Sequence, residues 1–307
     1  MRFGQGTRHH YNHRKLGVDI SVLGTGTMGT AVASGLLNAG HHVTVWNRSK
    51  ERAQRLVTRG ARAADTAEEA IGASSHTILV FSDEQATRQV LFANGTREAL
   101  RNGALASAVA MAPESCLALA KDVKAAGGRL SDVQITTYPD RVEDRSSEFL
   151  LACDPQDKED WARIFGSLGN KIQDVGTVGN ACKATLGLAL SSSFLTAAIA
   201  YSVAALDEMD LSGKVIRELL AGSLDVGIAE AKKCIPEMSH RTYGTGPWTV
   251  NSMVALIDTL TAFASNLKLD DAPLGAMGEL YAKAASLGYG DRNVTAVYEA
   301  LNPRSSA

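Results

Sequence analysis

The chain has 307 residues, of which 45% are hydrophobic, and its 31 Lys and Arg nearly balance its 33 Asp and Glu. This composition is typical of a globular protein with one large or two ordinary domains, and it excludes disordered, collagen-like and disulfide-framework chains. The net charge of −2 gives the molecule no overall attraction to nucleic acid or to an anionic membrane. We therefore expect neither as a partner.

Residues 1–17 form a basic arm that stands apart from the rest of the chain. The arm holds four Lys or Arg, no acidic residue, and no apolar core of the kind that a signal peptide needs. Its three histidines, His9, His10 and His13, follow a HHxxH pattern that has the chemistry of a metal site, whereas a solvated arm is the simpler interpretation.

Residues 18–178 alternate between short apolar runs and segments of helical periodicity. Strands are predicted at 20–23, 43–46 and 77–81, with helices at 51–58 and 66–71 and an earlier helix that Gly40 closes in a left-handed conformation. This alternation predicts an α/β fold, a Rossmann domain whose parallel sheet has helices on both faces. Residues 179–307 show helical periodicity only, which predicts a second, all-α domain.

One long segment of the second half carries no charge. Ala184 to Leu206 is 23 residues long, enough to cross a bilayer, but it is rich in Ala, Ser and Thr and is followed at once by acidic residues. We expect a long interdomain helix that protein buries on nearly all sides, with membrane insertion as the alternative.

The cysteines of this chain are far apart and form no CxxC pair. Closely paired cysteines are typical of zinc sites, so we expect no metal site and no disulfide. Free thiols fit a reducing cytoplasm, where we expect the protein to be. The four are Cys116, Cys153, Cys182 and Cys234.

A glycine-rich loop of the form GxGxxG follows the first strand and opens the first helix. Its residues are Gly24, Thr25, Gly26, Thr27, Met28 and Gly29. In this setting Gly24 permits the tight turn, Gly26 lets the backbone approach a pyrophosphate, and Gly29 lets the helix pack closely on the strand. The loop predicts dinucleotide binding at the helix N-terminus, the alternative being a strand–helix turn without a ligand.

The residues after the second strand distinguish NADP from NAD. An acidic residue usually binds the ribose hydroxyls of NAD, but this chain has Asn47 there. Arg48, Ser49 and Arg52 follow and supply donors for a 2′-phosphate, so we predict NADPH as the cofactor, unless the arginines are ordinary surface charges. Phe81, Ser82 and Asp83 end the strand at 77–81, at the sheet edge where cofactors bind, although Asp83 is equally suited to cap the next helix.

The segment VLGTGTMGTAVASGLLNAGHHVTVWNRSKERA, residues 22–53, resembles the opening of the β-hydroxyacid dehydrogenases and of the related imine reductases, in the 6-phosphogluconate dehydrogenase-like superfamily. The resemblance extends from Val18 to Leu301 and includes the long uncharged helix and the final segment from Gly278. It implies a homodimer with exchanged helical domains. Each active site then lies between a Rossmann domain and the helices of the partner subunit.

The catalytic positions of the resembling families point toward the imine reductases. The lysine position of the β-hydroxyacid dehydrogenases falls on Thr185 and the asparagine position on Ala189, while Lys183 points away from Thr185. Asp132 matches their carboxylate-binding turn, but the glycines that follow it there are replaced. A ketone needs a positioned acid and an iminium does not, because it already carries its proton.

Other side chains are candidates for the proton donor or the substrate pocket. Ser193 lies eight residues after Thr185, on the same helical face, and we name these two as the catalytic candidates. Tyr243, His240 and Asp225 are alternative acids, with surface or structural roles as the simpler interpretation. Trp248, Met253 and Phe194 line an apolar pocket or belong to the core.

From the sequence we therefore expect an NADPH-dependent reductase that transfers a hydride to a C=N bond of a small-molecule substrate. The alternatives are a β-hydroxyacid dehydrogenase-like carbonyl reductase and a non-catalytic NADP-binding protein, because Thr185 is neither the lysine of one family nor the Asp or Tyr that is usual in the other.

Overall fold

The computed structural model describes residues 17–93, 95–209 and 211–303. Contacts divide the chain into two compact units, Met1–Leu190 and Ser191–Ala307. The first unit extends past the predicted boundary at residue 178 because it includes the first turns of the long helix. The basic arm predicted for residues 1–17 lies outside the described residues, apart from Gly17.

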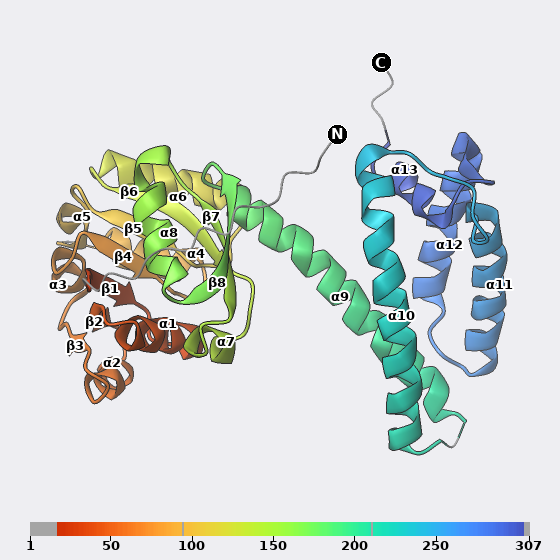
Figure 1. Ribbon diagram of the computed structural model, residues 1–307, viewed down its shortest axis with the longest axis horizontal. Coiled ribbons are helices and arrows are strands. Elements are labelled where there is room, and N and C mark those ends of the chain that lie inside the picture. Colours follow the sequence, from red (N-terminus) through yellow and green to blue (C-terminus); the bar gives the residue numbers. More distant parts are fainter. Residues whose placement is uncertain (1–16, 94, 210, 304–307) are drawn as a thin grey trace. The chain divides into compact units, whose positions relative to one another are not determined.

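The first unit is an eight-stranded sheet with helices (Figure 1). In chain order its elements are β1 (Asp19–Leu23), α1 (Thr27–Asn38), β2 (His42–Trp46), α2 (Lys50–Val57), β3 (Arg62–Ala63), α3 (Ala67–Gly72), β4 (His76–Leu79), α4 (Glu84–Leu91), α5 (Thr96–Ala99), β5 (Ala104–Ser107), α6 (Pro113–Ala125), β6 (Arg129–Ile135), α7 (Pro139–Glu143), β7 (Ser147–Ala152), η1 (Pro155–Asp157), α8 (Lys158–Gly166) and β8 (Gly169–Gly176). The predicted strands and helices of the opening half are confirmed, and Gly40 has the expected positive φ of 89°.

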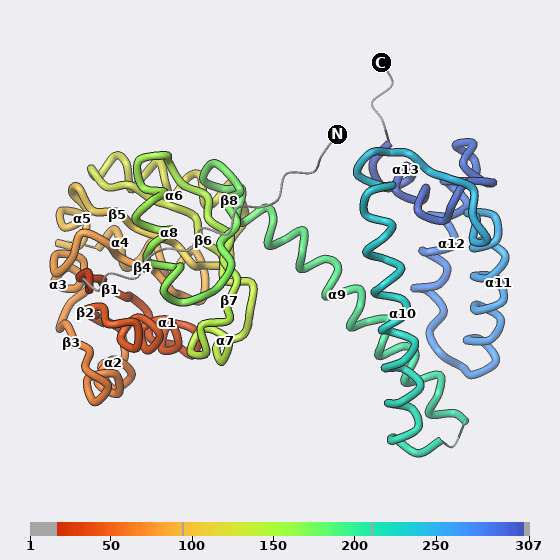
Figure 2. Tube along the Cα trace, viewed as in Figure 1, coloured from red at the N-terminus to blue at the C-terminus, as the bar shows by residue number. Residues whose placement is uncertain are grey.

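The order of the strands places a candidate binding site. The sheet runs β3-β2-β1-β4-β5-β6-β7-β8, so the chain starts at β1, moves outward to β3, and returns to β4 on the other side of β1 (Figure 2). The strand order therefore reverses between β1 and β4. In open sheets of this kind ligands bind in the crevice at the carboxyl ends of the strands where the order reverses.

Two apolar cores cover the two faces of this sheet because side chains alternate along each strand. In β1, Ile20 and Val22 belong to one core and Leu23 to the other, and Ile78 and Leu79 of β4 divide in the same way. Helices α1 and α8 contribute to the first core, and α3, α4 and α6 to the second. This arrangement confirms the predicted α/β fold with helices on both faces.

One strand pair departs from the predicted parallel sheet. Strand β7 pairs antiparallel with β6, while all other named pairs among the described strands are parallel. Only residues 136–146 connect the two, with α7 as a single short helix. A parallel crossover needs a dozen or more residues, usually including a full helix, so this connection returns the chain as a neighbouring antiparallel strand.

The second unit is helical, as predicted for the C-terminal part of the chain. It contains α10 (Gly213–His240), α11 (Val250–Asn266), α12 (Ala272–Ala284), η2 (Ala285–Tyr289), η3 (Val294–Val297) and α13 (Tyr298–Leu301). Ser212 and Thr249 cap α10 and α11 with their side chains. Val250, Ala284, Ala296 and Ala300 form a small buried core, which joins α11, the end of α12 and the C-terminal turns.

Helix α9 (Asn180–Asp207) confirms the long helix predicted from the uncharged run. The expectation that protein buries it is not met within this chain, because Ala181 and Cys182 are its only buried residues. Among the described residues it is also the one helix that is long and apolar enough to cross a membrane. Exposed leucines follow one another along it at Leu186, Leu188 and Leu190.

Candidate cofactor-binding site

The glycine loop joins β1 to α1 at the reversal of the strand order. Gly24 has a φ of 94°, and a Cβ atom built on it would lie 2.1 Å from the carbonyl oxygen of Val80. A Cβ on Gly29 would lie 1.8 Å from the carbonyl oxygen of Gly24. Only glycine fits these two positions, which agrees with the roles predicted for them.

Gly26 differs from the other two glycines because it faces open space. A Cβ built on it meets nothing within 4 Å, and Gly26 is the N-cap residue of α1 without a side-chain hydrogen bond to the helix. The N-terminus of α1 therefore borders a cradle that the missing side chain leaves free. A phosphate fits such a cradle, because it accepts from helix N-terminal amides and is attracted by the helix dipole.

A cleft of about 790 Å³ surrounds this loop. Of the predicted cofactor-binding residues it is lined by Gly24, Gly26, Thr27, Met28, Gly29, Asn47, Arg48, Ser49, Arg52, Phe81 and Ser82. The carboxyl ends of β1, β2 and β4 thus contribute to one site, as the strand order requires. The donor set of amides, arginines and a hydroxyl fits a phosphorylated nucleotide.

Two predicted residues do not line the cleft. Thr25 is buried, and its Oγ1 makes no hydrogen bond within the described part of the chain. Asp83 is the N-cap of α4, where its carboxylate accepts from the amide of Ala86 at 2.7 Å and from the hydroxyl of Ser82 at 2.7 Å. These hydrogen bonds lower the pKa of Asp83. The capping alternative therefore describes its position in the structure.

Asn47 has a structural role that the sequence did not reveal. Its Oδ1 accepts the backbone amide of Thr25 at 3.0 Å, and its Nδ2 donates to the carbonyl of Ser49 at 3.1 Å. The end of β2 is thereby fastened to the glycine loop. The position predicted to discriminate between dinucleotides thus also holds the glycine loop in shape.

The remaining wall of the cleft was not predicted. It is formed by Trp46, Asp65, Thr66, Ala67, Val80, Ala86, Gln89, Val90, Ala93 and Thr96. Asp65 is a negative charge at the rim, but it pairs with Lys50 at 2.8 Å, and both side chains are largely exposed. The pair leaves Arg48 and Arg52 as the uncompensated charges of the lining. Trp46 ends β2 and Val80 directly follows β4. The rest of the wall comes from α3, α4, α5 and the turns beside them, and no spacing in the sequence indicates those positions.

The catalytic candidates lie on α9. Thr185 is half-buried, and its Oγ1 is shielded from solvent and makes no hydrogen bond within the described residues. Ser193 is exposed and belongs to the second unit, whereas Thr185 belongs to the first. Lys183 is exposed, as expected for a residue on another face of the helix.

The alternative acids all lie in the second unit, and one of them already has a partner. The Tyr243 hydroxyl donates to Glu299 at 2.6 Å, and the same carboxylate pairs with Arg241 at 2.6 Å. Burial and Glu299 raise the pKa of Tyr243, so the phenol is a structural hydrogen-bond donor. His240 and Asp225 are both exposed residues of α10.

The three side chains considered for an apolar pocket are not core residues of this chain. Phe194 is 75% exposed and Trp248 is 56% exposed, while Met253 is half-buried. Core packing within the described residues therefore does not explain Phe194 or Trp248.

A sequence profile of the NAD-binding domain of 6-phosphogluconate dehydrogenase matches residues 19–178, just over half of the chain. The chain belongs to this NAD-binding family. The match covers the sheet, the glycine loop and the residues that line the cleft. The dinucleotide-binding domain predicted from GxGxxG is thus confirmed at the level of the family.

Relatives of this family member carry names of two kinds. Cytokine-like nuclear factor N-PAC of Anopheles gambiae is 26% identical over 90% of this chain, and the match covers 49% of that protein. Glyoxylate/succinic semialdehyde reductase 1 of Arabidopsis thaliana is 26% identical over 92% of this chain and 98% of its own length. The chain thus spans about half the length of the first relative and nearly the whole of the other.

An imine reductase from Myxococcus stipitatus has the same fold. Its structure with NADP+ covers 92% of this chain and 100% of its own, at 20% identity and a TM-score of 0.84. A V8 variant solved with NAD+ covers 94% of this chain and 100% of its own, at 18% identity and a TM-score of 0.85. At these sequence identities, the structural similarity to the imine reductase establishes the fold of this chain.

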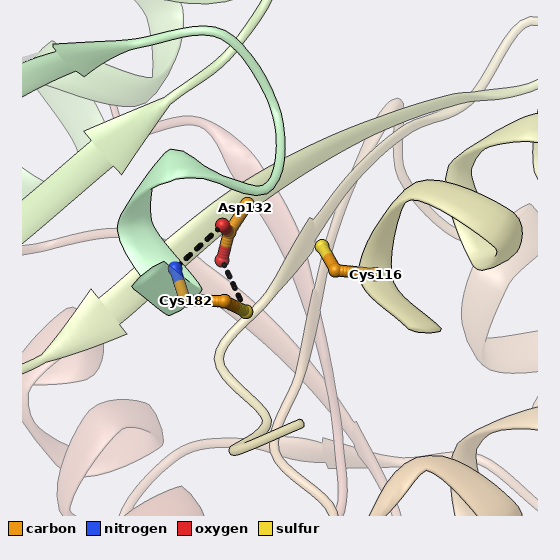
Figure 3. Close-up of side chains that lie close together, drawn as sticks. All are labelled: Cys116, Asp132 and Cys182. Atoms are coloured by element: carbon orange, nitrogen blue, oxygen red, sulfur yellow. Dashed lines mark hydrogen bonds between the residues drawn. The ribbon is translucent and has the colours of Figure 1, made fainter. Parts of the chain in front are cut away.

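Outside the cleft, the fold brings together residues that the sequence spacing separates. Asp132 on β6 is fully buried, and its Oδ2 accepts the backbone amide of Cys182 in the first turn of α9 at 2.9 Å. The Cys182 thiol donates to Oδ1 at 3.3 Å, and Cys116 of α6 lies beside both (Figure 3). The thiol of Cys116, burial and Asp132 together raise the pKa of Cys182. Spacing along the chain did not reveal this cluster.

Proposed function

We propose that this chain is an NADPH-dependent reductase that transfers a hydride to a carbon–nitrogen double bond. The observation that carries the proposal is a cofactor cleft with an intact phosphate cradle in a chain whose α9 has Thr185 at the lysine position of the resembling dehydrogenases. The imine reductases that share the fold support it.

The charges at the mouth of the cleft support NADPH as the cofactor. Arg48 and Arg52 line the cleft with Ser49 between them, and Asn47 brings no carboxylate to the end of β2. A 2′-phosphate would accept from these donors without a repelling neighbour, because Lys50 neutralises Asp65. The amides at the start of α1 would hold the pyrophosphate.

When bound, the reduced nicotinamide supplies the hydride. The chain's own contribution is to bind and orient the nucleotide and to present a substrate pocket without an ionisable proton donor at position 185. An iminium substrate arrives protonated, so no side chain needs to release a proton as the hydride is transferred. The Thr185 hydroxyl is free to donate one hydrogen bond or to orient a water molecule.

The proposal is tested by mixing the protein with NADPH and a panel of cyclic imines and 3-oxo acids, and following the absorbance of NADPH. We expect oxidation of NADPH with imines. Turnover on 3-oxo acids alone would instead assign the chain to carbonyl reduction, in line with the name of the Arabidopsis relative. Tight NADPH binding without turnover on any substrate would favour a non-catalytic nucleotide-binding protein, which suits the nuclear-factor relative.

We further propose that the active form is a homodimer in which helices of one copy cover those of the other. Large apolar side chains are exposed along α9 and α10, among them Leu190 at 62%, Phe194 at 75% and Val226 at 66%. A single chain in water rarely leaves such residues exposed side by side. A protein partner, rather than a membrane, matches the many Ala, Ser and Thr residues of α9.

Light scattering coupled to gel filtration tests the dimer. The natural chain is expected to elute at twice its mass of 32.4 kDa, and Val226→Glu to elute as a monomer. Lys232→Glu, a charge change at another exposed position of α10, serves as the control. A monomeric natural chain at micromolar concentration would refute the dimer and leave the cofactor assignment untouched.

The four free cysteines support a reducing cytoplasm as the location.

A further inference from the structure

Two cysteines and one aspartate meet inside the first unit, away from the residues that line the cofactor cleft. Cys116 comes from α6, Asp132 from β6 and Cys182 from the first turn of α9 (Figure 3). Their relative exposures are 0%, 0% and 2%. One sulfur or oxygen atom of each lies within 4.8 Å of the other two.

The carboxylate of this cluster is held by neutral donors. Asp132 accepts from the amide and the thiol of Cys182, and Gln134 donates to its Oδ1 at 3.1 Å. A buried charge without a cation is costly unless hydrogen bonds and dipoles compensate it, and here the N-terminus of α9 supplies the dipole. The site is therefore anionic, preorganised and closed to water.

We propose that Cys116, Asp132 and Cys182 bind a thiophilic divalent cation, with Zn²⁺ as the natural occupant. Thiolate and carboxylate oxygen are ligands that Zn²⁺ prefers, and three protein ligands are enough to anchor a four-coordinate ion. Tetrahedral bonds of ordinary length place two coordinating sulfurs about 3.8 Å apart. Because the ligand atoms already lie within 4.8 Å of one another, the two sulfurs need to approach by at most about 1 Å. A water molecule that enters with the ion completes the coordination, while Gln134 remains a donor to the ligand carboxylate.

The charge balance of the cluster favours the replacement of two thiol protons by one Zn²⁺ ion. Without the ion, two neutral thiols and one carboxylate give the cluster a charge of −1. When Zn²⁺ binds, both thiols lose their protons, and two thiolates, one carboxylate and one dication again sum to −1. The buried site therefore takes up the ion in exchange for two protons without gaining net charge. The ion would tie the first turn of α9 to β6 and α6.

Cadmium provides the spectroscopic test, because its thiolate complexes absorb in the ultraviolet. Tag-free, reduced protein is titrated with Cd²⁺ in a variant with His9→Ala, His10→Ala and His13→Ala, which removes the histidine cluster of the N-terminal arm as a competitor. We expect a thiolate-to-metal band that saturates at one ion per chain. In weakly buffered solution the same titration should release two protons per ion, a readout that needs no cysteine variant.

Substitutions then locate the site. Cys116→Ser and Cys182→Ser should each abolish the saturating band, and Asp132→Asn should weaken binding at least tenfold. Gln134→Leu, which removes a donor to the ligand carboxylate, should weaken it roughly 10–100-fold. Cys153→Ser, which changes another buried thiol, is the matched control and should bind as the parent does. Circular dichroism reports whether each variant is folded.

Three results would overturn the proposal. The first is reduced protein that shows no band and no proton release at one equivalent of Cd²⁺. The second is a band that persists in folded Cys116→Ser or Cys182→Ser. The third is a disulfide between Cys116 and Cys182 in protein purified with reductant, which would assign the pair to oxidation. None of these results depends on NADPH or on the proposed reductase activity.

Discussion

Arg48→Ala tests the assignment of the cleft mouth to the 2′-phosphate. The Arg48 side chain lines the cleft but is exposed, so its hydrogen bond to a phosphate is screened by solvent. Hydrogen bonds to charged groups contribute about 1.5–3 kcal/mol, and the exposure places this one near the lower figure. The variant should therefore bind NADPH roughly tenfold more weakly, since about 1.4 kcal/mol corresponds to a factor of ten.

The assay is a calorimetric titration of NADPH and NADH into the natural chain and the variant. The dissociation constant for NADH should change by less than about twofold, because NADH lacks the phosphate that the guanidinium would bind. Arg55→Ala, on the helix α2 that begins two residues after Arg48 but outside the cleft lining, is the control and should leave both constants unchanged. Equal losses for the two nucleotides in Arg48→Ala would refute the assignment.

Three further predictions concern the glycine loop, helix α9 and the start of strand β4. Gly26→Ala should fold normally but bind NADPH at least tenfold more weakly in calorimetry, because its Cβ enters the open cradle. Gly29→Ala should instead lower the free energy of unfolding, measured in urea, by about 3 kcal/mol, because its Cβ collides with backbone atoms. Unchanged NADPH affinity in Gly26→Ala would contradict the cradle. Thr185→Ala should reduce turnover of an imine while the NADPH dissociation constant stays the same, and an unaltered rate would make this hydroxyl structural. Burial lowers the pKa of His76 below 6.5. As the pH drops below about 6.5, the unfolded chain therefore takes up a proton at this histidine before the folded chain does. The free energy of unfolding should fall over this range. His76→Gln should flatten that decline between pH 7 and pH 5.5, and an identical slope in urea titrations would show that other groups cause it.

The sequence predicted the parts of the fold that local chemistry determines. Gly24 and Gly29 have no room for a side chain, and Gly40 has a positive φ, so their positions could be derived from the turn geometry that glycine alone permits. The direction of β7 could not be derived from periodicity, because a strand has the same alternation in either direction. It depends on the length of the connection through α7 and on which edge of the sheet is free.

The residues of the candidate site also fall into those that the local sequence predicted and those that depend on the folded sheet. Arg48, Ser49 and Arg52 were predicted because they follow β2 directly, where the dinucleotide-binding pattern has its specificity position. The wall from α3 to α5 was missed, since these helices join the cleft only through the strand order of the folded sheet. Trp46 was also missed, although it ends β2 directly before Asn47. Cys116 and Cys182 were taken as separate because they are far apart in the sequence, whereas the packing of α6 and the start of α9 beside β6 brings them together.

Asn47 has a consequence for how this protein can change over evolutionary time. The codons for asparagine and aspartate differ by one nucleotide, and an aspartate here would still offer an oxygen to the amide of Thr25. The glycine loop would keep that tether, while a negative charge appeared at the position that we propose selects between the two nicotinamide coenzymes. On that proposal, we expect a single mutation to shift the coenzyme preference without an intermediate in which the loop has lost its anchor.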